Sequence, residues 1–171
     1  MARTVTMKGQ PLTLAGPELK VGDKAPGFRV LDRELNEVGL EDCGGKVRLL
    51  SVTPSLDTPV CDMQARRFNE EAAKLGDVSV FNISMDLPFA IDRFCTAAGI
   101  DKVQALSDHR EASFGRAYGV LIEELRLLAR SVFVVDRGDT IRYIEIVPEI
   151  KDHPDYEKAL EAARRLVAQE A

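Results

Sequence analysis

Apolar runs and apolar residues at helical spacing alternate along the chain, and this alternation predicts an α/β protein. Residues 47–53 (VRLLSVT) and 78–84 (VSVFNIS) are continuous apolar, β-branched runs of the kind found in strands buried within a sheet. The segments 59–75 and 89–98 instead place apolar residues on one helical face, and the second ends at Gly99, a residue that suits a helix C-cap. Two buried strands with their helices therefore form the expected centre of the fold.

Both ends of the chain carry hairpin patterns. Residues 3–7 and 11–15 are short β-like runs on either side of a Lys-Gly-Gln turn, and 129–136 and 140–147 flank Arg137-Gly138-Asp139. The final segment, 154–171, reads as an amphipathic helix. Weaker signals predict strands at 28–32 and 103–108, a loop around Cys43 and a helix at 111–120.

These elements follow one another as a hairpin and then β-α-β-α-β-α-β-β-α. Alternating strands and helices favour a mixed central sheet flanked by helices, with antiparallel strands added by the last hairpin. The chain has 171 residues and shows no internal repeat or linker, so we expect residues 1–171 to form a single domain.

Composition narrows the class of protein. Hydrophobic residues make up 45% and charged residues 30% of the sequence, as in ordinary soluble globular proteins. A net charge of −5 argues against a general nucleic-acid binder. The sequence has no apolar run near the ~20 residues of a membrane span and no secretory signal at its start, so we expect a cytoplasmic protein without a membrane anchor.

The chain contains three cysteines, Cys43, Cys61 and Cys95. An odd number in a reducing cytosol argues against a structural disulfide framework. The sequence has no CxxC motif and its two histidines, His109 and His153, lie far apart, so we expect no metal site and no cofactor.

The stretch TPSLDTPVC (53–61) places Cys61 at a helix start. Thr58 suits the N-cap, with its hydroxyl expected to accept a backbone N–H of the first turn, and Pro59 suits the first helical position. Cys61 is then the third helical residue, where a thiolate gains roughly 0.3–1 kcal/mol from the helix dipole. The preceding strand delivers this turn to its carboxyl end, where open α/β sheets place their sites.

Two observations keep a structural role for Cys61 open on the residues alone. Asp62 is adjacent and disfavours a thiolate, unless Arg66, Arg67 or Arg130 supplies a compensating cation. A single cysteine near a helix start is also more often a small buried hydrophobe than a reactive group.

Several spaced motifs nevertheless resemble one family. Pro54-x-x-x-Thr58-x-x-Cys61 matches the active-site pattern of peroxiredoxins, and SVTPSLDTPVC resembles that of the thiol peroxidase subfamily. MDLPFAIDRFC (85–95), SDHREASFGRAYGV (107–120) and LARSVFVVD (128–136) resemble further motifs of that subfamily, as does the N-terminal hairpin. The resemblance extends over nearly the whole chain.

The resemblance implies a thioredoxin-like fold and a thiol-dependent peroxidase that reduces hydrogen peroxide and organic hydroperoxides. It implies that Cys61 is the peroxidatic cysteine, that Thr58 hydrogen-bonds the thiolate and the peroxide, and that Pro54 shields the pocket. Arg130 would stabilise the anionic sulfur; on the residues alone, a surface ion pair is the better interpretation of this arginine. Cys95 would be the resolving cysteine in an intramolecular disulfide, against the residue-based interpretation of an apolar helix position. Thioredoxin would be the reductant, and a homodimer is expected.

Cys61 and Cys95 lie on two different predicted helices. Packed helices have axes about 8–10 Å apart, whereas a disulfide needs Cα atoms within roughly 4.4–6.8 Å. We therefore expect the reduced protein to keep the two sulfurs apart and one or both helix starts to unwind during each cycle.

The residues are compatible with more than one interpretation at three points. A redox-sensing module built on the same cysteine pair is an alternative function, whereas the lack of CxxC weighs against a thioredoxin-type disulfide oxidoreductase. Cys43 has no place in the motifs and is either an idle loop thiol or a secondary oxidation site. Phe89 and its apolar neighbours suit alkyl or lipid hydroperoxides, but hydrogen peroxide is equally compatible.

Overall fold

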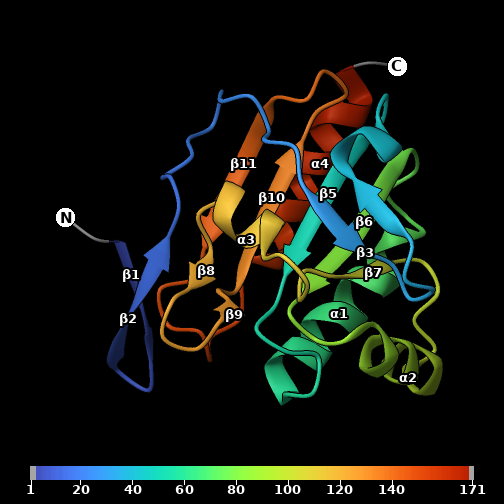
Figure 1. The fold of residues 1–171 in the computed structure, drawn as a ribbon. Coiled ribbons are helices and arrows are strands. Elements are labelled where there is room, and N and C mark those ends of the chain that lie inside the picture. The colour runs from blue at the N-terminus through green and yellow to red at the C-terminus, as the bar shows by residue number, and fades with distance from the viewer. Residues whose placement is uncertain (1–2, 170–171) are drawn as a thin grey trace.

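The computed structural model describes residues 3–169, whose strands form two sheets (Figure 1). The larger sheet has seven strands in the order β11-β10-β5-β6-β7-β3-β4. Strands β5, β6 and β7 are parallel and the remaining pairs are antiparallel. The bounds of these strands are β3 Arg29–Leu31, β4 Glu37–Gly39, β5 Val47–Val52, β6 Val78–Ser84, β7 Gln104–Ser107, β10 Ser131–Val135 and β11 Ile141–Ile146.

The smaller sheet has the order β1-β2-β8-β9 and brings the N-terminal hairpin against a later segment of the chain. Its strands are β1 Arg3–Met7, β2 Gln10–Ala15, β8 Leu121–Ile122 and β9 Leu127–Leu128. The helices are α1 Pro59–Ala72, α2 Pro88–Ala98, α3 Ser113–Ala117 and α4 Tyr156–Gln169, and a 3₁₀ helix spans Leu40–Cys43.

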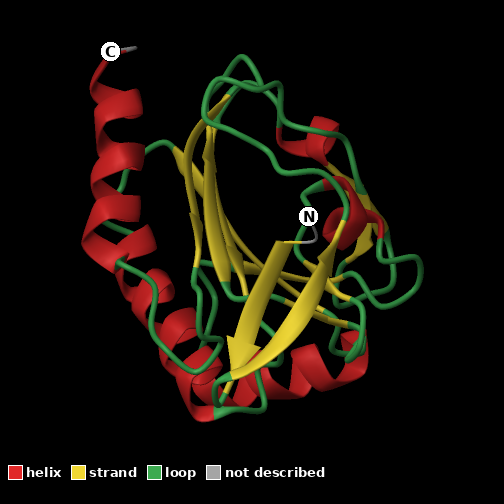
Figure 2. Ribbon diagram, turned by 90° about the vertical axis from the view of Figure 1, so that its left-hand side faces the viewer, coloured by secondary structure: helices red, strands yellow, loops and turns green. Residues whose placement is uncertain are grey.

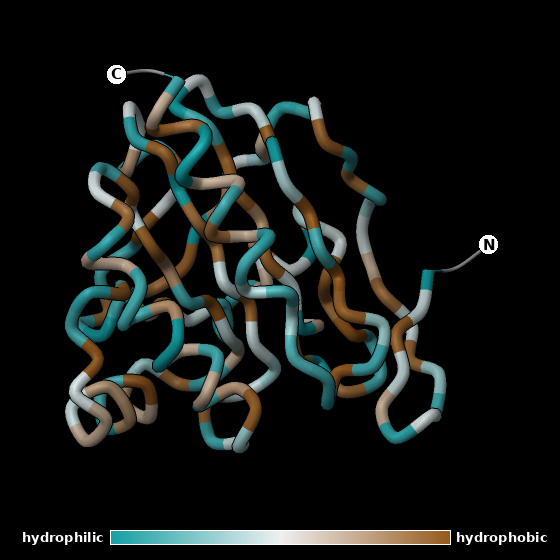
Figure 3. Tube along the Cα trace, turned by 180° about the vertical axis from the view of Figure 1, so that it is seen from behind, coloured by the Kyte–Doolittle hydropathy of each residue, from teal (hydrophilic) through white to brown (hydrophobic). Residues whose placement is uncertain are grey.

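The large sheet separates two hydrophobic cores, because successive side chains of a strand point to opposite faces. In β5, Val47 and Leu49 pack with α1, α2 and α4, whereas Leu50 and Val52 pack on the opposite side with Phe114 and other residues around α3. Figure 2 shows α4 and α3 on opposite sides of the sheet, with the hairpin nearest the viewer. In Figure 3, hydrophobic and hydrophilic residues alternate along the helical turns, as expected for helices that cover a sheet with one face.

The structure confirms the predicted α/β class, the mixed central sheet and both hairpins. Among the predicted boundaries that change, α1 ends at Ala72 rather than residue 75, the helix predicted at 111–120 shortens to α3, and the final helix begins at Tyr156 rather than residue 154. Cys43 ends a 3₁₀ turn instead of lying in an irregular loop. Residues 170–171 of the predicted final helix lie outside the described residues.

The N-terminal hairpin is tied to the segment that follows β11. Thr6 donates its backbone N–H to the Pro148 carbonyl (2.7 Å) and accepts one from Ile150 (2.9 Å). Gly9, in the hairpin turn, donates to Glu149 Oε1 at 3.0 Å. These bonds place the tip of the hairpin beside the carboxyl end of β5, where the chain enters α1.

Candidate active site

Strand β5 delivers Cys61 to the carboxyl end of the sheet. All six residues of β5 are buried, and Thr53 continues the pairing by donating its backbone N–H to the Ile83 carbonyl at 3.0 Å. The loop that follows ends at Thr58, the N-cap of α1, and Pro59 is the first helical residue, as predicted. Cys61 lies in the first turn and is 0% exposed, so bulk water does not surround the sulfur.

Thr58 is the N-cap residue, but its hydroxyl does not cap the helix. It donates a hydrogen bond to the Ser55 carbonyl at 2.9 Å, and no N–H of the first turn bonds to its side chain. The predicted capping bond is therefore wrong. The hydroxyl instead fixes the loop before the helix, which leaves its oxygen lone pairs without a helix N–H donor.

Of the three arginines considered as partners for a Cys61 thiolate, two are occupied elsewhere. Arg66 forms an ion pair with Asp62, the acidic neighbour of Cys61, which offsets the charge that opposes a thiolate. Arg67 bonds Glu157 at 2.7 Å and covers the Tyr156 ring at 5.1 Å. Arg130 therefore remains as the arginine available to the site.

Arg130 is 2% exposed and has neutral hydrogen-bond partners. Its Nε donates to the Ile150 carbonyl and its Nη1 to Gln64 Oε1, each at 2.9 Å. No carboxylate lies within ion-pair distance of this guanidinium among the ion pairs found in residues 3–169. Burying a charge without a counterion is costly, so Arg130 is prepared to receive an anion.

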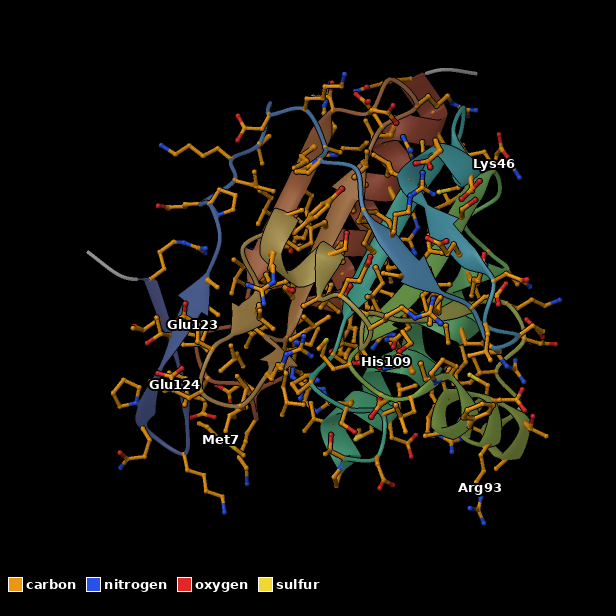
Figure 4. The ribbon with its side chains drawn as sticks, viewed as in Figure 1. Met7, Lys46, Arg93, His109, Glu123 and Glu124 are labelled. Atoms are coloured by element: carbon orange, nitrogen blue, oxygen red, sulfur yellow. The ribbon has the colours of Figure 1, made fainter. Side chains whose placement is uncertain are left out.

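A cavity of about 340 Å³ lies at this point of the molecule. Three of the predicted site residues, Pro54, Thr58 and Arg130, line it together, while the fully buried Cys61 lies one residue beyond the lining residue Val60. Met7, labelled in Figure 4, reaches the cavity from the hairpin, and its other walls are mostly apolar. The remaining lining residues are Ser55, Pro59, Leu127, Ile150 and Lys151.

A buried polar network beneath α1 holds Arg130 in place. Gln64, one turn after Cys61, donates from Nε2 to Ser51 Oγ at 2.7 Å while its Oε1 accepts the Arg130 bond. Asn82 of β6 adds contacts to Ser51 (3.5 Å) and to the Thr53 hydroxyl (3.3 Å). Sequence reasoning missed this network, although polar residues at Ser51 and Asn82 inside apolar strands were a signal for it.

Tyr156, the first residue of α4, is a second residue that the sequence did not indicate. Burial raises the pKa of its phenol, the charges of Arg130 and Arg67 oppose that shift, and a Cys61 thiolate adds to it. Its ring packs edge-on against Phe68 at 5.4 Å, and its hydroxyl lies 2.7 Å from His153 Nδ1. The pKa of Tyr156, on α4, therefore depends on the charges of Arg130 and Cys61.

Cys95 is a buried residue of α2 and, like Cys61, a free thiol. It is 2% exposed and packs in the core with Ile91 and Ile100. Burial raises the pKa of the Cys95 thiol; the Arg33 guanidinium opposes this shift and Asp92 adds to it. The two cysteines thus lie on separate helices without a disulfide between them.

Within residues 3–169 no group of three His, Cys, Asp or Glu side chains is arranged to hold a metal ion. No helix in the same range is long and apolar enough to cross a membrane.

Comparison with known proteins gives consistent matches. A model of the Redoxin family matches residues 20–160. The thiol peroxidase of Bacillus subtilis is 62% identical over 163 residues, covering 95% of this chain and 98% of the relative. That of Halalkalibacterium halodurans is 60% identical over 161 residues, covering 94% and 97%.

Solved structures agree with the fold. A crystal structure of a peroxiredoxin-like protein from Aquifex aeolicus superposes with a TM-score of 0.90 and 44% identity, covering 97% of this chain and 98% of the other. A thiol peroxidase from Chromobacterium violaceum gives a TM-score of 0.86 at 22% identity over 98% of both chains, a likeness of fold alone.

The thioredoxin-like sheet and a cysteine at the start of the helix after its central strand define a peroxiredoxin-type protein. The chain belongs to the Redoxin family. Its thiol peroxidase relatives, at 60% and 62% identity, make it a thiol-dependent peroxidase.

Proposed function

We propose that Cys61 is the peroxidatic cysteine and that Pro54, Thr58 and Arg130 complete its site. The observation that carries this proposal is Arg130, a buried guanidinium with neutral partners that shares a cavity with Pro54 and Thr58. Its charge is available to a thiolate and to the oxygen that departs from the peroxide. Preorganised donors of this kind act where charge develops in a transition state.

The proposed first step is attack by the Cys61 thiolate on the terminal oxygen of a hydroperoxide. An S–O bond forms and the O–O bond breaks; the leaving oxygen takes the electron pair and a proton and departs as water or an alcohol. Cys61 is left as a sulfenic acid. Arg130 and the Thr58 hydroxyl are the groups proposed to stabilise the departing oxygen.

We propose that Cys95 then resolves the sulfenic acid. Its thiolate attacks the Cys61 sulfur, an intramolecular disulfide forms, and the sulfenic oxygen leaves as water once protonated. Both cysteines are buried on separate helices, which supports a local opening before they meet. Leaving the core also removes the main cause of the raised pKa of Cys95, which favours its thiolate at that moment.

Peptide mass spectrometry after peroxide titration tests these roles. Wild type is expected to form a Cys61–Cys95 disulfide, Cys95→Ser to accumulate over-oxidised Cys61, and Cys61→Ser to lose peroxidase activity. Cys43→Ser is the matched control and should behave as wild type. A wild-type disulfide through Cys43 would overturn the assignment of Cys95.

The reductant proposed for the disulfide is thioredoxin, as the resemblance of the motifs to thiol peroxidases implies. Turnover of hydroperoxide with NADPH, thioredoxin reductase and thioredoxin tests this step. Sustained NADPH oxidation supports a peroxidase cycle. A disulfide that forms once and is not reduced would favour the alternative of a redox-sensing module.

The apolar cavity supports organic hydroperoxides as substrates in addition to hydrogen peroxide. Met7, Val60 and Leu127 offer the cavity apolar side chains around an alkyl group. We expect Met7→Asp to raise KM for cumene hydroperoxide about fivefold or more while leaving that for hydrogen peroxide within twofold. An equal change for both substrates would contradict this role of the cavity.

The wider setting is also a proposal. Relatives align with 94–95% of the chain, which supports residues 1–171 acting as one domain. We propose a homodimer in the cytoplasm. Analytical ultracentrifugation of the reduced protein and fractionation of cells that produce it are the direct measurements.

A further inference from the structure

The carboxylate of Asp86 joins the two segments that carry Cys61 and Cys95. Asp86 lies after β6 and two residues before Pro88, where α2 begins. Its side chain reaches back to the loop that precedes α1. A residue of the segment that leads into α2 therefore bonds the loop that leads into α1.

The contacts with the Cys61 loop are short and directed. Ser55 Oγ donates to Asp86 Oδ1 at 2.7 Å, and the Leu56 backbone N–H donates to Oδ2 at 2.8 Å. The Ser55 carbonyl in turn accepts the Thr58 hydroxyl at 2.9 Å. Asp86 thereby determines the orientation of Thr58 through Ser55, without itself lining the cavity at Arg130.

Contacts with the ends of two strands anchor Asp86 through its carboxylate and its backbone carbonyl. Ser84 Oγ donates to Asp86 Oδ2 at 2.8 Å, and Ser107 Oγ donates to the Asp86 carbonyl. Ser84 and Ser107 end the central strands β6 and β7 and are buried. The anchor is therefore part of the rigid sheet, whereas the Ser55 and Leu56 contacts belong to a loop.

A cavity of about 490 Å³ lies beside these bonds, between the Ser55–Asp57 loop and α2. Phe94 and Arg93 line it from α2, and Figure 4 shows Arg93 directed away from the body of the molecule. Because side chains do not pack closely around this cavity, the hydrogen bonds to Asp86 contribute a larger share of the interactions that hold the Ser55–Asp57 loop in place than they would in a close-packed core.

We propose that Asp86 is a positioning residue that selects between two states of the Cys61 loop. With its bonds to Ser55 and Leu56 made, the loop presents Thr58 for the reaction with peroxide. With those bonds broken, the start of α1 is released to meet Cys95. This role rests on the proposed function, because it assumes that Cys61 and Cys95 form a disulfide.

Asp86→Asn tests the proposal, since it retains the shape of the side chain but loses the charge and one acceptor oxygen. We expect oxidation of Cys61 by peroxide to slow about tenfold, since a hydrogen bond to a charged group typically accounts for that factor or more. Disulfide formation from the sulfenic acid should accelerate. The peroxide concentration that over-oxidises half of Cys61 during turnover should rise about tenfold.

The measurements are stopped-flow thiol oxidation, quenched-flow disulfide formation and mass spectrometry of Cys61 against peroxide concentration. Asp101→Asn, an exposed carboxylate beyond α2, is the matched control and should leave all three unchanged. Ser55→Ala removes the Oδ1 contact, together with the 3.2 Å bond from the Asp57 N–H to Ser55 Oγ, but keeps the Leu56 bond to Oδ2, and should give a smaller change in the same directions. It decides the question if Asp86→Asn does not fold.

Two results would overturn this role. One is a folded Asp86→Asn variant in which both rate constants stay within twofold of wild type. The other is a variant that slows both steps equally, so that over-oxidation does not change, as a purely structural role predicts. If wild type forms no Cys61–Cys95 disulfide, the proposed function fails and this role fails with it; a normal wild-type disulfide with an unchanged variant overturns only the role of Asp86.

Discussion

Each end of strand β5 combines a cysteine with a buried arginine, but the two pairs differ in how the charge of the arginine is balanced. At the carboxyl end, Arg130 donates to an amide and a backbone carbonyl and has neutral partners there. At the amino end, Arg48 is 0% exposed and forms an ion pair with Asp139 at 2.6 Å. The first guanidinium is available to an anion, whereas the second already has one.

Cys43 and Cys61, at the two ends of β5, also differ in their surroundings. Cys43 is the last residue of a 3₁₀ turn and its thiol donates to the Leu40 carbonyl at 3.3 Å, a bond that only the protonated form makes. Burial raises the pKa of Cys43, although the nearby Arg48 opposes that shift. Cys61 lies instead in the first turn of a fourteen-residue helix. Under the proposed function, the cysteine that reacts is the one whose neighbouring buried arginine has no carboxylate partner among the described residues.

Exchanging the arginines for methionine gives the largest expected contrast. Arg130→Met should slow the reaction of Cys61 with peroxide roughly 100-fold or more, in line with the loss of one preorganised donor to a developing negative charge. Arg48→Met should leave that rate within about threefold but lower the free energy of unfolding by about 1–3 kcal/mol, because it removes a buried guanidinium that pairs with the exposed Asp139 and bonds the Asp136 carbonyl. Stopped-flow oxidation and urea unfolding measure the two effects.

Equal losses of rate in the two variants would show that both arginines act only through the fold. Arg130→Lys sharpens the comparison. It keeps the charge but cannot bond Ile150 and Gln64 in the geometry of the guanidinium, so we expect partial loss of rate.

Asp108 shows how burial affects an acidic side chain instead of a basic one. It is buried after β7 and accepts the backbone N–H groups of Phe114 and Gly115, at 3.0 and 2.8 Å. Burial raises its pKa to about 6 from 3.8, against the opposing effect of these bonds. The folded protein therefore holds this proton more tightly than the unfolded chain does, and the stability gained from it is present below about pH 4 and is lost as the pH rises through 6.

The change expected from Asp108 amounts to about 3 kcal/mol across that window. Urea unfolding at a series of pH values, compared between wild type and Asp108→Asn, isolates it, because the variant lacks the titrating group. Identical pH profiles for the two proteins would show that Asp108 titrates alike in the folded and unfolded states.

The centre of the fold was predictable because its signals are local. The apolar runs that became β5 and β6 reflect burial on both faces, and the Thr58-Pro59 pair marks the start of α1 by its own backbone preferences. Strands β8 and β9 have two residues each and were not predicted. Strand β8 pairs with β2, which is distant in the sequence, and β9 pairs with β8.

The site was less accessible to reasoning from residues alone. On those grounds Arg130 was interpreted as a surface ion pair, and only the family resemblance assigned it to the site. The structure shows Arg130 buried, with hydrogen-bond partners that lie 20 and 66 positions away in the sequence. The residues next to Arg130 in the sequence indicate neither that it is buried nor that it has no carboxylate partner in the described part of the chain. The same holds for Asp86, whose partners lie on a loop and a strand distant in the chain.

Gln64 offers a smaller effect that tests how Arg130 is held. Gln64→Leu removes the acceptor for Arg130 Nη1 and the donor to Ser51 Oγ. We expect the oxidation rate of Cys61 to fall about tenfold, as for loss of one hydrogen bond to a charged group. Asn69→Leu, on the same helix but bonded to Lys102 and Val103, is a matched control for stability. A loss of rate in Asn69→Leu equal to that in Gln64→Leu would point to a general weakening of α1.

The smallest expected effect concerns Cys43. Because its thiol is bonded to Leu40 and Arg48 is neutralised by Asp139, Cys43→Ala should leave the oxidation of Cys61 and steady turnover within twofold of wild type. In the Cys61→Ser variant, Cys43 should also remain a thiol at peroxide concentrations that fully oxidise Cys61 in wild type. Mass spectrometry of the Cys43 peptide measures this directly. Sulfenic or sulfinic acid at Cys43 under those conditions would mean that an ion-paired arginine still activates a neighbouring thiol, and the contrast between the two ends of β5 would then rest on helix position alone.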